Sequence, residues 1–256
     1  MIVAVTVVVL VVSCRRDGVR GPVSGVRAAA ESSAAAPRAV RASHETGHLT
    51  PDARFIVFLG TSLTAGLGLD PDQAYPALIQ RKLDSLKLPW RAVNAGVSGE
   101  TSAGALRRLD WLLRDRPSIL VVETGANDML RGVNLDSTRA NLSSIVRRAR
   151  EADPDVTIVV AGMEAAPNLG PRYAAQFRAL YRDLASRDRL PLIPFLLQGV
   201  GGVDSLNQAD GIHPTAAGDQ IVADNVWRVL APLVARRTDA PAHGRTVAPS
   251  REGRAP

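Results

Sequence analysis

The sequence predicts an α/β protein, a three-layer α/β/α sandwich built around a five-stranded parallel sheet. Short runs of β-branched and apolar residues alternate along the middle of the chain with longer segments whose apolar residues recur at the helical period. Parallel strands require crossover connections, and helices in those connections cover both faces of the sheet. Apolar residues make up 46% of the 256-residue chain and charged residues 22%, which fits one well-buried domain with tails.

Five segments are predicted to be strands, because each is a short run of apolar, often β-branched residues. The fifth contains two prolines. Proline cannot donate to the hydrogen-bond ladder, so we expect this strand at an edge of the sheet. The predicted strands are residues 55–59, 92–94, 119–123, 157–161 and 190–195.

Three segments are predicted to be helices, each with one apolar face that packs on the sheet. We interpret the aromatic residues in these faces as core, because an apolar face at helical spacing is the usual signature of packing. The three faces consist of Tyr75, Leu78, Ile79, Leu83 and Leu86, of Tyr173, Phe177, Leu180, Tyr181 and Leu184, and of Ile221, Val222, Val226, Val229, Leu230 and Leu233.

The net charge of +6 belongs mainly to the ends of the chain. Between Pro51 and Arg236 there are 21 basic and 20 acidic residues, whereas the flanks hold 10 basic and 5 acidic ones. Nucleic-acid binding needs a basic surface that neutralises several phosphates, often with aromatic residues for base stacking. The charge distribution therefore argues against a nucleic-acid partner.

The first 14 residues are predicted to be a lipoprotein-type signal segment. Residues 2–13 form an apolar run that is far short of the ~20 residues needed to span a bilayer, so a signal-peptide core fits better. The run ends in L-V-V-S-C, which resembles a bacterial lipoprotein box. Lipidation of Cys14 would anchor the protein in the cell envelope, facing the periplasm or the exterior. Without the anchor the protein would be secreted.

No Lys or Arg precedes this apolar run, so an uncleaved signal anchor or a misplaced start codon stays an alternative. Cys14 is the only cysteine of the chain, which excludes disulfides, thiolate catalysis and cysteine-based zinc sites. Residues 15–50 and 238–256 are predicted to be a disordered linker and a disordered tail, because neither has the apolar periodicity that offsets ordering entropy. The folded domain is expected over residues 51–237.

Polar motifs follow the first three predicted strands, and a fourth precedes the last helix. The carboxyl ends of parallel strands share one edge of the sheet, and ligands bind there at the point where the strand order reverses. We therefore expect the motifs to face one site. They are G-T-S-L-T-A-G-L-G at residues 60–68, N-A-G-V-S-G-E-T at 94–101, E-T-G-A-N-D-M at 123–129 and D-G-I-H-P at 210–214.

Ser62, Asp210 and His213 are the candidates for a catalytic triad. A serine hydroxyl is a weak nucleophile, and it needs a base to take its proton and an acid to fix the tautomer of that base. Of four histidines, only His213 lies outside the predicted disordered flanks. Pro214 suits the first position of a helix, so we expect a helix to begin there and to hold His213 rigidly.

The backbone of Ser62, together with Gly99 and Asn127, is the candidate oxyanion hole. Acyl transfer needs donors aimed at the developing oxyanion, and removing one such donor costs ~3 kcal/mol in other enzymes. Glycine lets the backbone approach the substrate closely, and an asparagine after the third strand can point its amide into the same cleft.

In these motifs the chain resembles the SGNH, or GDSL, hydrolase family, and most closely its bacterial arylesterase and acyl-CoA thioesterase/lysophospholipase branch. The similarity covers about residues 55–234, and residues 162–173 look like the substrate-facing loop of that branch. Ser62, Gly99, Asn127 and His213 match the four blocks of the family in order, with Asp210 as the triad acid.

The resemblance implies a flavodoxin-like fold and a serine esterase that forms an acyl-enzyme on Ser62. It implies small carboxylic esters as substrates, such as aryl esters, thioesters or lysophospholipids, and neither a metal nor an organic cofactor. Thr61 stands where the family has an aspartate before the serine. The triad does not use that aspartate, so we expect activity with altered loop geometry or pH dependence.

Each of these residues also fits a simpler structural role. Ser62 alone fits a helix cap, Gly99 a backbone turn, and Asn127 and Asp128 turn positions. The joint arrangement favours the catalytic interpretation for all except Asp128, which we interpret as a turn residue. The chain lacks nucleotide-binding glycine motifs and the G-x-S-x-G elbow, and one core histidine is too few for a metal-dependent hydrolase.

Two other functions stay open at this point. One is removal of acetyl groups from cell-envelope or plant polysaccharides by the same groups. The other is a tethered binding protein that keeps the fold without turnover, for which Thr61 is the only support. The loops at residues 129–134 and 163–172 are expected to shape the pocket that selects the acyl chain, and the sequence does not predict an oligomeric state.

Overall fold

The computed structural model describes residues 54–239, and their strands and helices alternate along the chain. The strands are β1 (Arg54–Gly60), β2 (Trp90–Gly96), β3 (Ile119–Val122), β4 (Thr157–Ala161) and β5 (Leu192–Ile193). The helices are α1 (Ser62–Ala65), α2 (Tyr75–Ser85), α3 (Ser102–Leu113), α4 (Ala126–Leu130), α5 (Leu135–Ala152), α6 (Pro171–Asp188) and α7 (Ala216–Asp239). Two short 3-10 helices, η1 (Pro167–Leu169) and η2 (Asp204–Leu206), lie in the connections.

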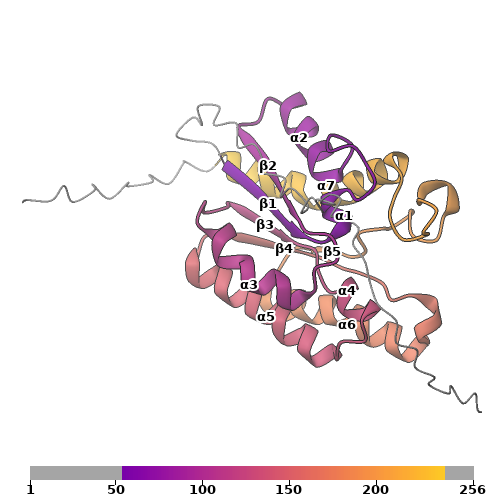
Figure 1. Ribbon diagram of the computed structural model, residues 1–256. Helices are drawn as coiled ribbons and strands as arrows, with labels where there is room; N and C mark the ends of the chain where they lie inside the picture. The colour runs from indigo at the N-terminus through magenta and orange to yellow at the C-terminus, as the bar shows by residue number, and fades with distance from the viewer. Residues whose placement is uncertain (1–53, 240–256) are drawn as a thin grey trace, which may run out of the picture. The chain divides into compact units, whose positions relative to one another are not determined.

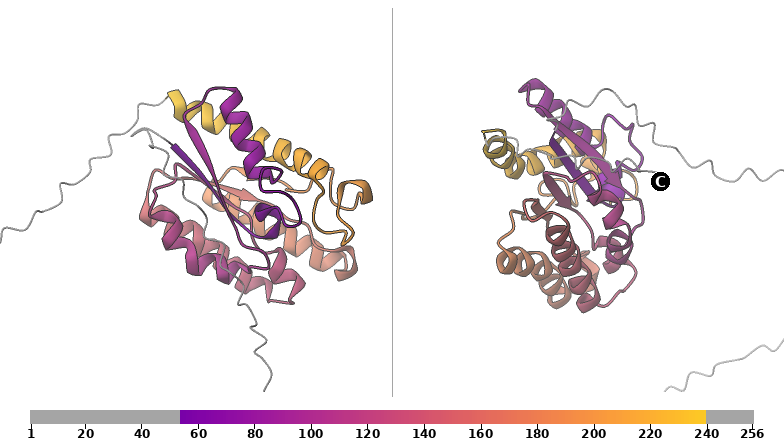
Figure 2. Two further views of the ribbon diagram at one scale, coloured as in Figure 1. Left: turned by 45° about the horizontal axis from the view of Figure 1, so that its top comes forward. Right: turned by 90° about the vertical axis from the view of Figure 1, so that its left-hand side faces the viewer.

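These elements form the predicted three-layer sandwich (Figure 1). The strands are all parallel, in the order β2-β1-β3-β4-β5. α2 and α7 cover one face of the sheet, whereas α3, α5 and α6 cover the other, as the further views also show (Figure 2). The fold class is therefore confirmed, and the apolar faces named above had not revealed α3 and α5.

The predicted signal segment with Cys14 and the predicted linker lie outside the described residues. The predicted tail lies there too, except for its first two residues, which continue α7. Thr238 accepts a hydrogen bond from the indole of Trp90 at 2.9 Å, so the folded part extends beyond residue 237. Among the helices of residues 54–239, none has both the length and the apolar character that a membrane crossing requires.

Strand pairing explains where the sheet differs from its predicted strands. β2 is longer than residues 92–94 because it stays in register with β1 from Trp90 to Gly96. β5 is shorter than residues 190–195, since only Leu192 and Ile193 pair with β4. It lies at the edge of the sheet, as the prolines on either side of it predicted.

The core lies between the sheet and both helix layers, and β3 at the centre is completely buried. Four of the five apolar residues predicted for α2 are buried there, but Leu86 is 57% exposed. The prediction for Leu86 is wrong because α2 ends at Ser85 and the next residue, Leu86, only caps it. Lys87 then turns the chain away with a positive φ of 54°.

Two helices have N-termini that are capped by carboxylates from distant parts of the chain. Neither N-cap residue, Ala74 of α2 or Thr101 of α3, makes a side-chain cap. Instead, buried Asp219 of α7 accepts from the Tyr75 backbone N–H at 2.9 Å, and buried Asp128 of α4 accepts from the N–H of Ser102 at 2.7 Å. The helix dipole favours negative charge at these positions. The two hydrogen bonds also join α7 to α2 and α4 to α3, which lie far apart in sequence.

Asp219→Asn is expected to remove one source of pH-dependent stability. Burial raises the pKa of Asp219 to about 7, and the Tyr75 N–H opposes this only partly. A raised folded-state pKa favours the fold at pH values below the unfolded pKa, and this advantage disappears as the pH rises through 7. At about 1.4 kcal/mol per pH unit, the loss between pH 4 and pH 7 reaches at most about 4 kcal/mol.

The measurement is urea unfolding of the parent protein and the variant at several pH values between 4 and 8. We expect the asparagine variant to gain relative stability as the pH rises, because its amide oxygen still accepts from Tyr75 without ionising. An equal difference between the two proteins at all pH values would contradict the assignment.

Candidate active site

Ser62, His213 and Asp210 come together at the carboxyl ends of the strands. Ser62 is the first residue of α1, immediately after β1, whereas the other two lie in the loop before α7. His213 Nε2 is 2.8 Å from Ser62 Oγ, and His213 Nδ1 is 2.6 Å from an Asp210 carboxylate oxygen. The three side chains form one continuous hydrogen-bonded row.

The turn around Asp210 keeps this carboxylate ionised. One of its oxygens accepts from the backbone N–H groups of Ile212 and His213 at 2.9 and 3.0 Å. These bonds and the imidazole hold the pKa of Asp210 well below its usual range, the His213 N–H contributing most. An ionised carboxylate can only accept, so His213 donates from Nδ1 and turns the lone pair of Nε2 toward the Ser62 hydroxyl.

A β-bridge, rather than a helix, holds His213. We expected a helix to begin at Pro214, and this expectation is wrong because α7 begins at Ala216. Pro214 instead forms an isolated antiparallel bridge with Asn207, and the carbonyl of His213 accepts from the Gln208 N–H at 2.7 Å.

The side chain of Gln208 ties this loop to the segment after β1. Its amide nitrogen donates to the carbonyl of Leu67, two residues beyond the one-turn helix of Ser62, at 2.7 Å and to that of Pro214 at 2.9 Å. A single side chain therefore connects the segment that carries Ser62 with the segment that carries His213.

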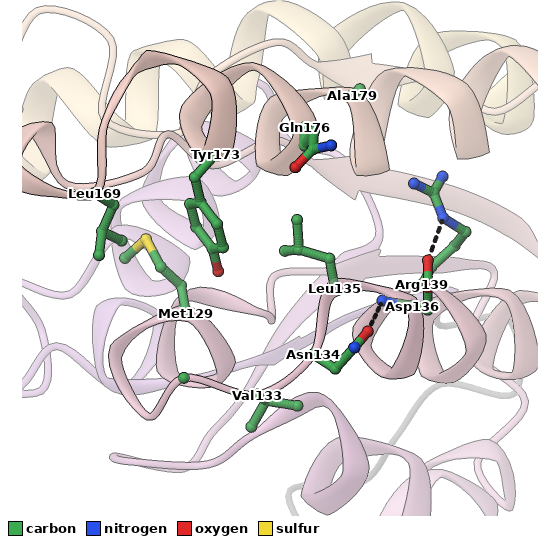
Figure 3. Close-up of a pocket in the computed structure, with 11 residues that line it drawn as sticks. Met129, Val133, Asn134, Leu135, Asp136, Arg139, Leu169, Tyr173, Gln176 and Ala179 are labelled. Atoms are coloured by element: carbon green, nitrogen blue, oxygen red, sulfur yellow. Dashed lines mark hydrogen bonds and ion pairs between the residues drawn. The ribbon is translucent and has the colours of Figure 1, made fainter.

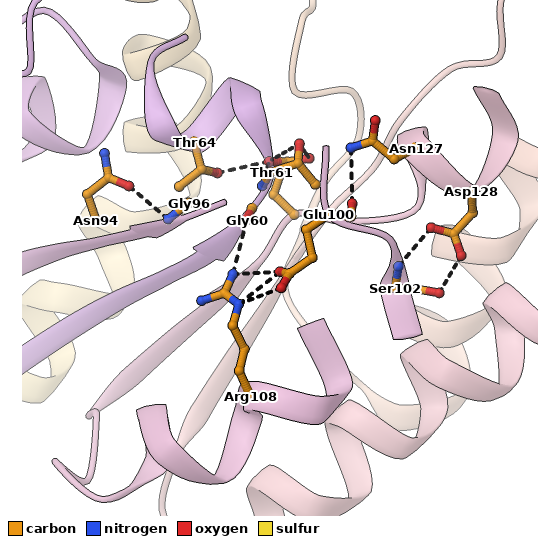
Figure 4. A network of polar contacts seen from close by, with 11 residues as sticks. Gly60, Thr61, Thr64, Asn94, Gly96, Glu100, Ser102, Arg108, Asn127 and Asp128 are labelled. Carbon is orange, nitrogen blue, oxygen red and sulfur yellow. Dashed lines mark hydrogen bonds and ion pairs between the residues drawn. The ribbon is translucent and has the colours of Figure 1, made fainter. Parts of the chain in front are cut away.

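Of the candidate oxyanion donors, Gly99 lies in the loop after β2 and Asn127 in the short helix α4, and a hydrogen bond joins the two segments. Gly99 follows β2 and has a φ of +76°, a conformation in which side chains are strained. The Asn127 amide donates to the carbonyl of Glu100 at 3.0 Å (Figure 4). That bond uses one of two amide hydrogens, which leaves the other for a ligand.

The loop after β2 is held by a charged pair that the sequence did not suggest. Arg108 of α3 binds Glu100 through two nitrogens, with the shortest contact at 2.7 Å, and also reaches the carbonyl of Gly60 at 3.2 Å (Figure 4). Arg131, at the end of α4, donates to the carbonyl of Gly99 at 2.7 Å. These arginines fix the loops that carry the candidate donors, and neither belongs to a motif.

Asp128 is not a turn residue, contrary to our interpretation. It lies within α4 and is buried, with its carboxylate bound by the hydroxyl of Ser102 at 2.5 Å and by that of Thr138 at 3.2 Å. Beside Asn127 it anchors α3 and α5 to the loop after β3. Its neighbour Asn127 therefore lies in a helix that these contacts hold in place.

A buried carboxylate, Glu123, lies beneath the turn at residues 60–65, which carries Ser62. It follows β3 and accepts from the backbone and hydroxyl of Thr61 and from the hydroxyl of Thr64. Burial raises the pKa of Glu123 to about 7, although these hydrogen bonds oppose the rise. A Cβ on Gly60 would lie 1.9 Å from Thr64 Oγ1 and 2.8 Å from the Glu123 carboxylate, so only glycine fits there.

A cavity of about 520 Å³ lies beside α4. Its walls come from α4, the loop after it, α5, η1 and α6, with Met129, Leu135, Leu169 and Tyr173 supplying apolar surface (Figure 3). No triad residue lines it, but Asn127 is two residues from Met129 in α4. The two loops that we expected to shape a substrate pocket both contribute to its lining.

Within residues 54–239, no group of three or more His, Cys, Asp or Glu side chains is placed to hold a metal ion. The site as described consists of a hydroxyl, an imidazole, a carboxylate and nearby amide donors. Such a set can transfer an acyl group through the hydroxyl.

The chain matches known proteins over this same region. The model of the GDSL-like Lipase/Acylhydrolase family matches residues 58–221. Esterase TesA of Pseudomonas aeruginosa is 42% identical over 183 residues, which is 71% of this chain and 90% of that protein. The Escherichia coli protein named thioesterase 1/protease 1/lysophospholipase L1 is 36% identical over 180 residues, which is 70% of this chain and 84% of that protein.

A solved structure shares both the fold and much of the sequence. The esterase EstA from Pseudoalteromonas sp., in a crystal structure described as inhibited by monoethylphosphonate, aligns with a TM-score of 0.67 and 31% identity. The alignment covers 71% of this chain and 99% of that one.

Proposed function

This chain belongs to the GDSL-like lipase/acylhydrolase family and is a serine esterase, and we propose that Ser62, His213 and Asp210 are its catalytic triad. The observation that carries the proposal is the unbroken row of short contacts from the serine to the imidazole to the carboxylate, 2.8 and 2.6 Å. The lowered pKa of Asp210 keeps its carboxylate ionised, as its role requires.

In the proposed first step, Ser62 attacks the ester carbonyl while His213 Nε2 takes its proton. Asp210 stabilises the imidazolium that forms and keeps the ring oriented. Negative charge develops on the carbonyl oxygen, and donors from the Ser62 backbone, Gly99 and Asn127 stabilise it. His213 then gives its proton to the leaving alcohol, and the acyl group stays on the serine.

In the second step, water hydrolyses the acyl-enzyme. His213 takes a proton from the water, which attacks the acyl carbonyl, and the same donors stabilise the second oxyanion. The bond to Ser62 breaks, the proton returns to the serine oxygen, and the carboxylic acid leaves. No metal or organic cofactor takes part in this scheme.

For the substrate, we propose small carboxylic esters whose acyl group lies in the cavity beside α4. Apolar walls from Met129, Leu169 and Tyr173 suit an acyl chain, and Asn127, the proposed oxyanion donor, lies in the same helix as Met129. Relatives named as an esterase, as a thioesterase and lysophospholipase, and as an arylesterase support aryl esters, thioesters and lysophospholipids as candidates. Release of acetate from acetylated glycans, but not from these esters, would favour glycan deacetylation instead.

We keep the bacterial cell envelope as the proposed location. Its support is the apolar run at residues 2–13 followed by Cys14, the residue proposed to carry the lipid anchor. A tethered esterase would act on substrates that reach the membrane surface.

Replacement of the nucleophile is the first test. In Ser62→Ala, hydrolysis of p-nitrophenyl butyrate is expected to fall by roughly 10³-fold or more, because the acyl-enzyme no longer forms. Purified parent and variant are compared at equal concentration, with circular dichroism to show that both are folded. Equal rates would reject the proposed role of Ser62.

Asn127→Ala separates oxyanion stabilisation from substrate binding. Loss of one oxyanion donor is expected to lower kcat by roughly 10²- to 10³-fold and to leave KM nearly unchanged, since the donor acts on charge that exists only in the transition state. Asn141→Ala is a matched control, because that amide also donates to a neighbour, the Ser102 hydroxyl, but on α5. A raised KM with normal kcat would show that Asn127 binds the ground state instead.

A further inference from the structure

We propose that Glu123 is a positioning residue of the hydrolytic site, whose buried carboxylate holds the turn that presents Ser62 and does so through Thr61 and Thr64. This inference rests on the proposed function, since it concerns the same serine. Glu123 has no exposed surface and touches neither His213 nor Asp210 through any contact described above. Its effect would therefore pass through the backbone of the turn.

Every described side-chain hydrogen bond of Glu123 ends on the turn that carries Ser62. Oε2 accepts from the Thr61 N–H at 2.7 Å and from the Thr64 hydroxyl at 2.9 Å, and Oε1 accepts from the Thr61 hydroxyl at 3.0 Å. These residues flank Ser62 on both sides. The carboxylate is in turn fixed to the sheet, because the Glu123 N–H donates to the carbonyl of Leu59 at 2.8 Å.

The partners of Glu123 can all donate to an anion. An ionised Glu123 only accepts, so the one hydroxyl hydrogen of Thr64 then points to it, and the contact of 2.6 Å with the Tyr75 hydroxyl is donated by the tyrosine. The hydrogen bonds then run from Tyr75 through Thr64 to Glu123. A protonated Glu123 would have to donate a hydrogen of its own, and this would reverse the direction of one of these bonds.

The charge of Glu123 has no cationic partner among the ion pairs of residues 54–239. Tyr75 of α2 and Tyr181 of α6 lie near it, and the pKa of both is raised, first by burial and then by the charge of Glu123. Asp219 lies beyond Tyr75, and Arg108 of α3 ends on Glu100 and the Gly60 carbonyl. Hydrogen bonds from the turn are therefore what stabilises the anion, and the anion in return orders the turn.

Thr61 suits this arrangement in a way that an acid would not. Its hydroxyl lies 3.0 and 3.1 Å from the two carboxylate oxygens of Glu123. An aspartate here would place a second carboxylate against the first, and two carboxylates at such a distance share one proton. The hydroxyl instead gives Glu123 a donor and lets it remain an anion.

The test compares Glu123→Gln with the parent protein from pH 5.5 to pH 9. The amide keeps the size of the side chain but turns N–H₂ toward donors, so the turn loses at least one bond. We expect kcat for p-nitrophenyl butyrate to fall roughly 10- to 100-fold at pH 8, as for small displacements of reacting groups, with KM within about twofold.

The ratio of variant to parent activity is the decisive readout, because ionisations elsewhere in the protein affect both proteins alike. Glu123 of the parent becomes neutral as the pH falls through about 7, so we expect the ratio to rise toward one at pH 5.5. A ratio that stays constant across the pH range would overturn the inference, and so would a variant with parental kcat at pH 8.

A second pair of variants protects the test against a Gln variant that fails to fold. Thr61→Val removes the hydroxyl and keeps the size, whereas Thr61→Ser keeps the hydroxyl. We expect the serine variant to retain parental kcat and the valine variant to lose activity at pH 8. Equal activity of the two overturns the inference alone, whereas a parent protein without ester hydrolysis overturns it together with the proposed function.

Discussion

The parallel register of β1 with its two neighbours is the constraint on which the site depends. β1 pairs with β2 up to Gly60 and Gly96, and with β3 up to Leu59 and Val122. Three chain segments therefore leave the sheet at one edge, where the strand order reverses. The first carries Ser62, the second Gly99 and the third Asn127. The loop before α7 then brings His213 to Ser62, from which it lies 151 residues away in sequence.

Buried acids stabilise this edge through hydrogen bonds and not through ion pairs. Asp219 and Asp128 accept from the first N–H groups of α2 and α3, and Glu123 accepts from the turn of the nucleophile. A carboxylate buried without a cation is stable only while its donors stay in place. The same three bonds thus couple the helix layers to the loops. A shift of any of these elements would leave a buried carboxylate without its hydrogen-bond donor.

Local sequence patterns predicted the layers and the grouping of Ser62, Asp210 and His213, but not the contacts that support them. The strands and Ser62 were predictable because apolar runs end directly before polar motifs. The ends of β2 depend on pairing with β1, and α7 begins after Pro214 because a bridge with Asn207 holds that residue. Glu123 was predicted only as the last residue of a strand. Its partner Thr61 is 62 residues away, and no local pattern encodes such a contact.

The measurement that tests the central claim most directly is covalent labelling by a fluorophosphonate, with the modified peptide identified by mass spectrometry. An imidazole in contact with the serine makes its oxygen reactive. We therefore expect one adduct, on Ser62, formed at least roughly 100-fold more slowly in His213→Ala, in keeping with the weight of general base catalysis. A folded protein that is not labelled at Ser62, or one labelled equally fast without His213, would contradict the account.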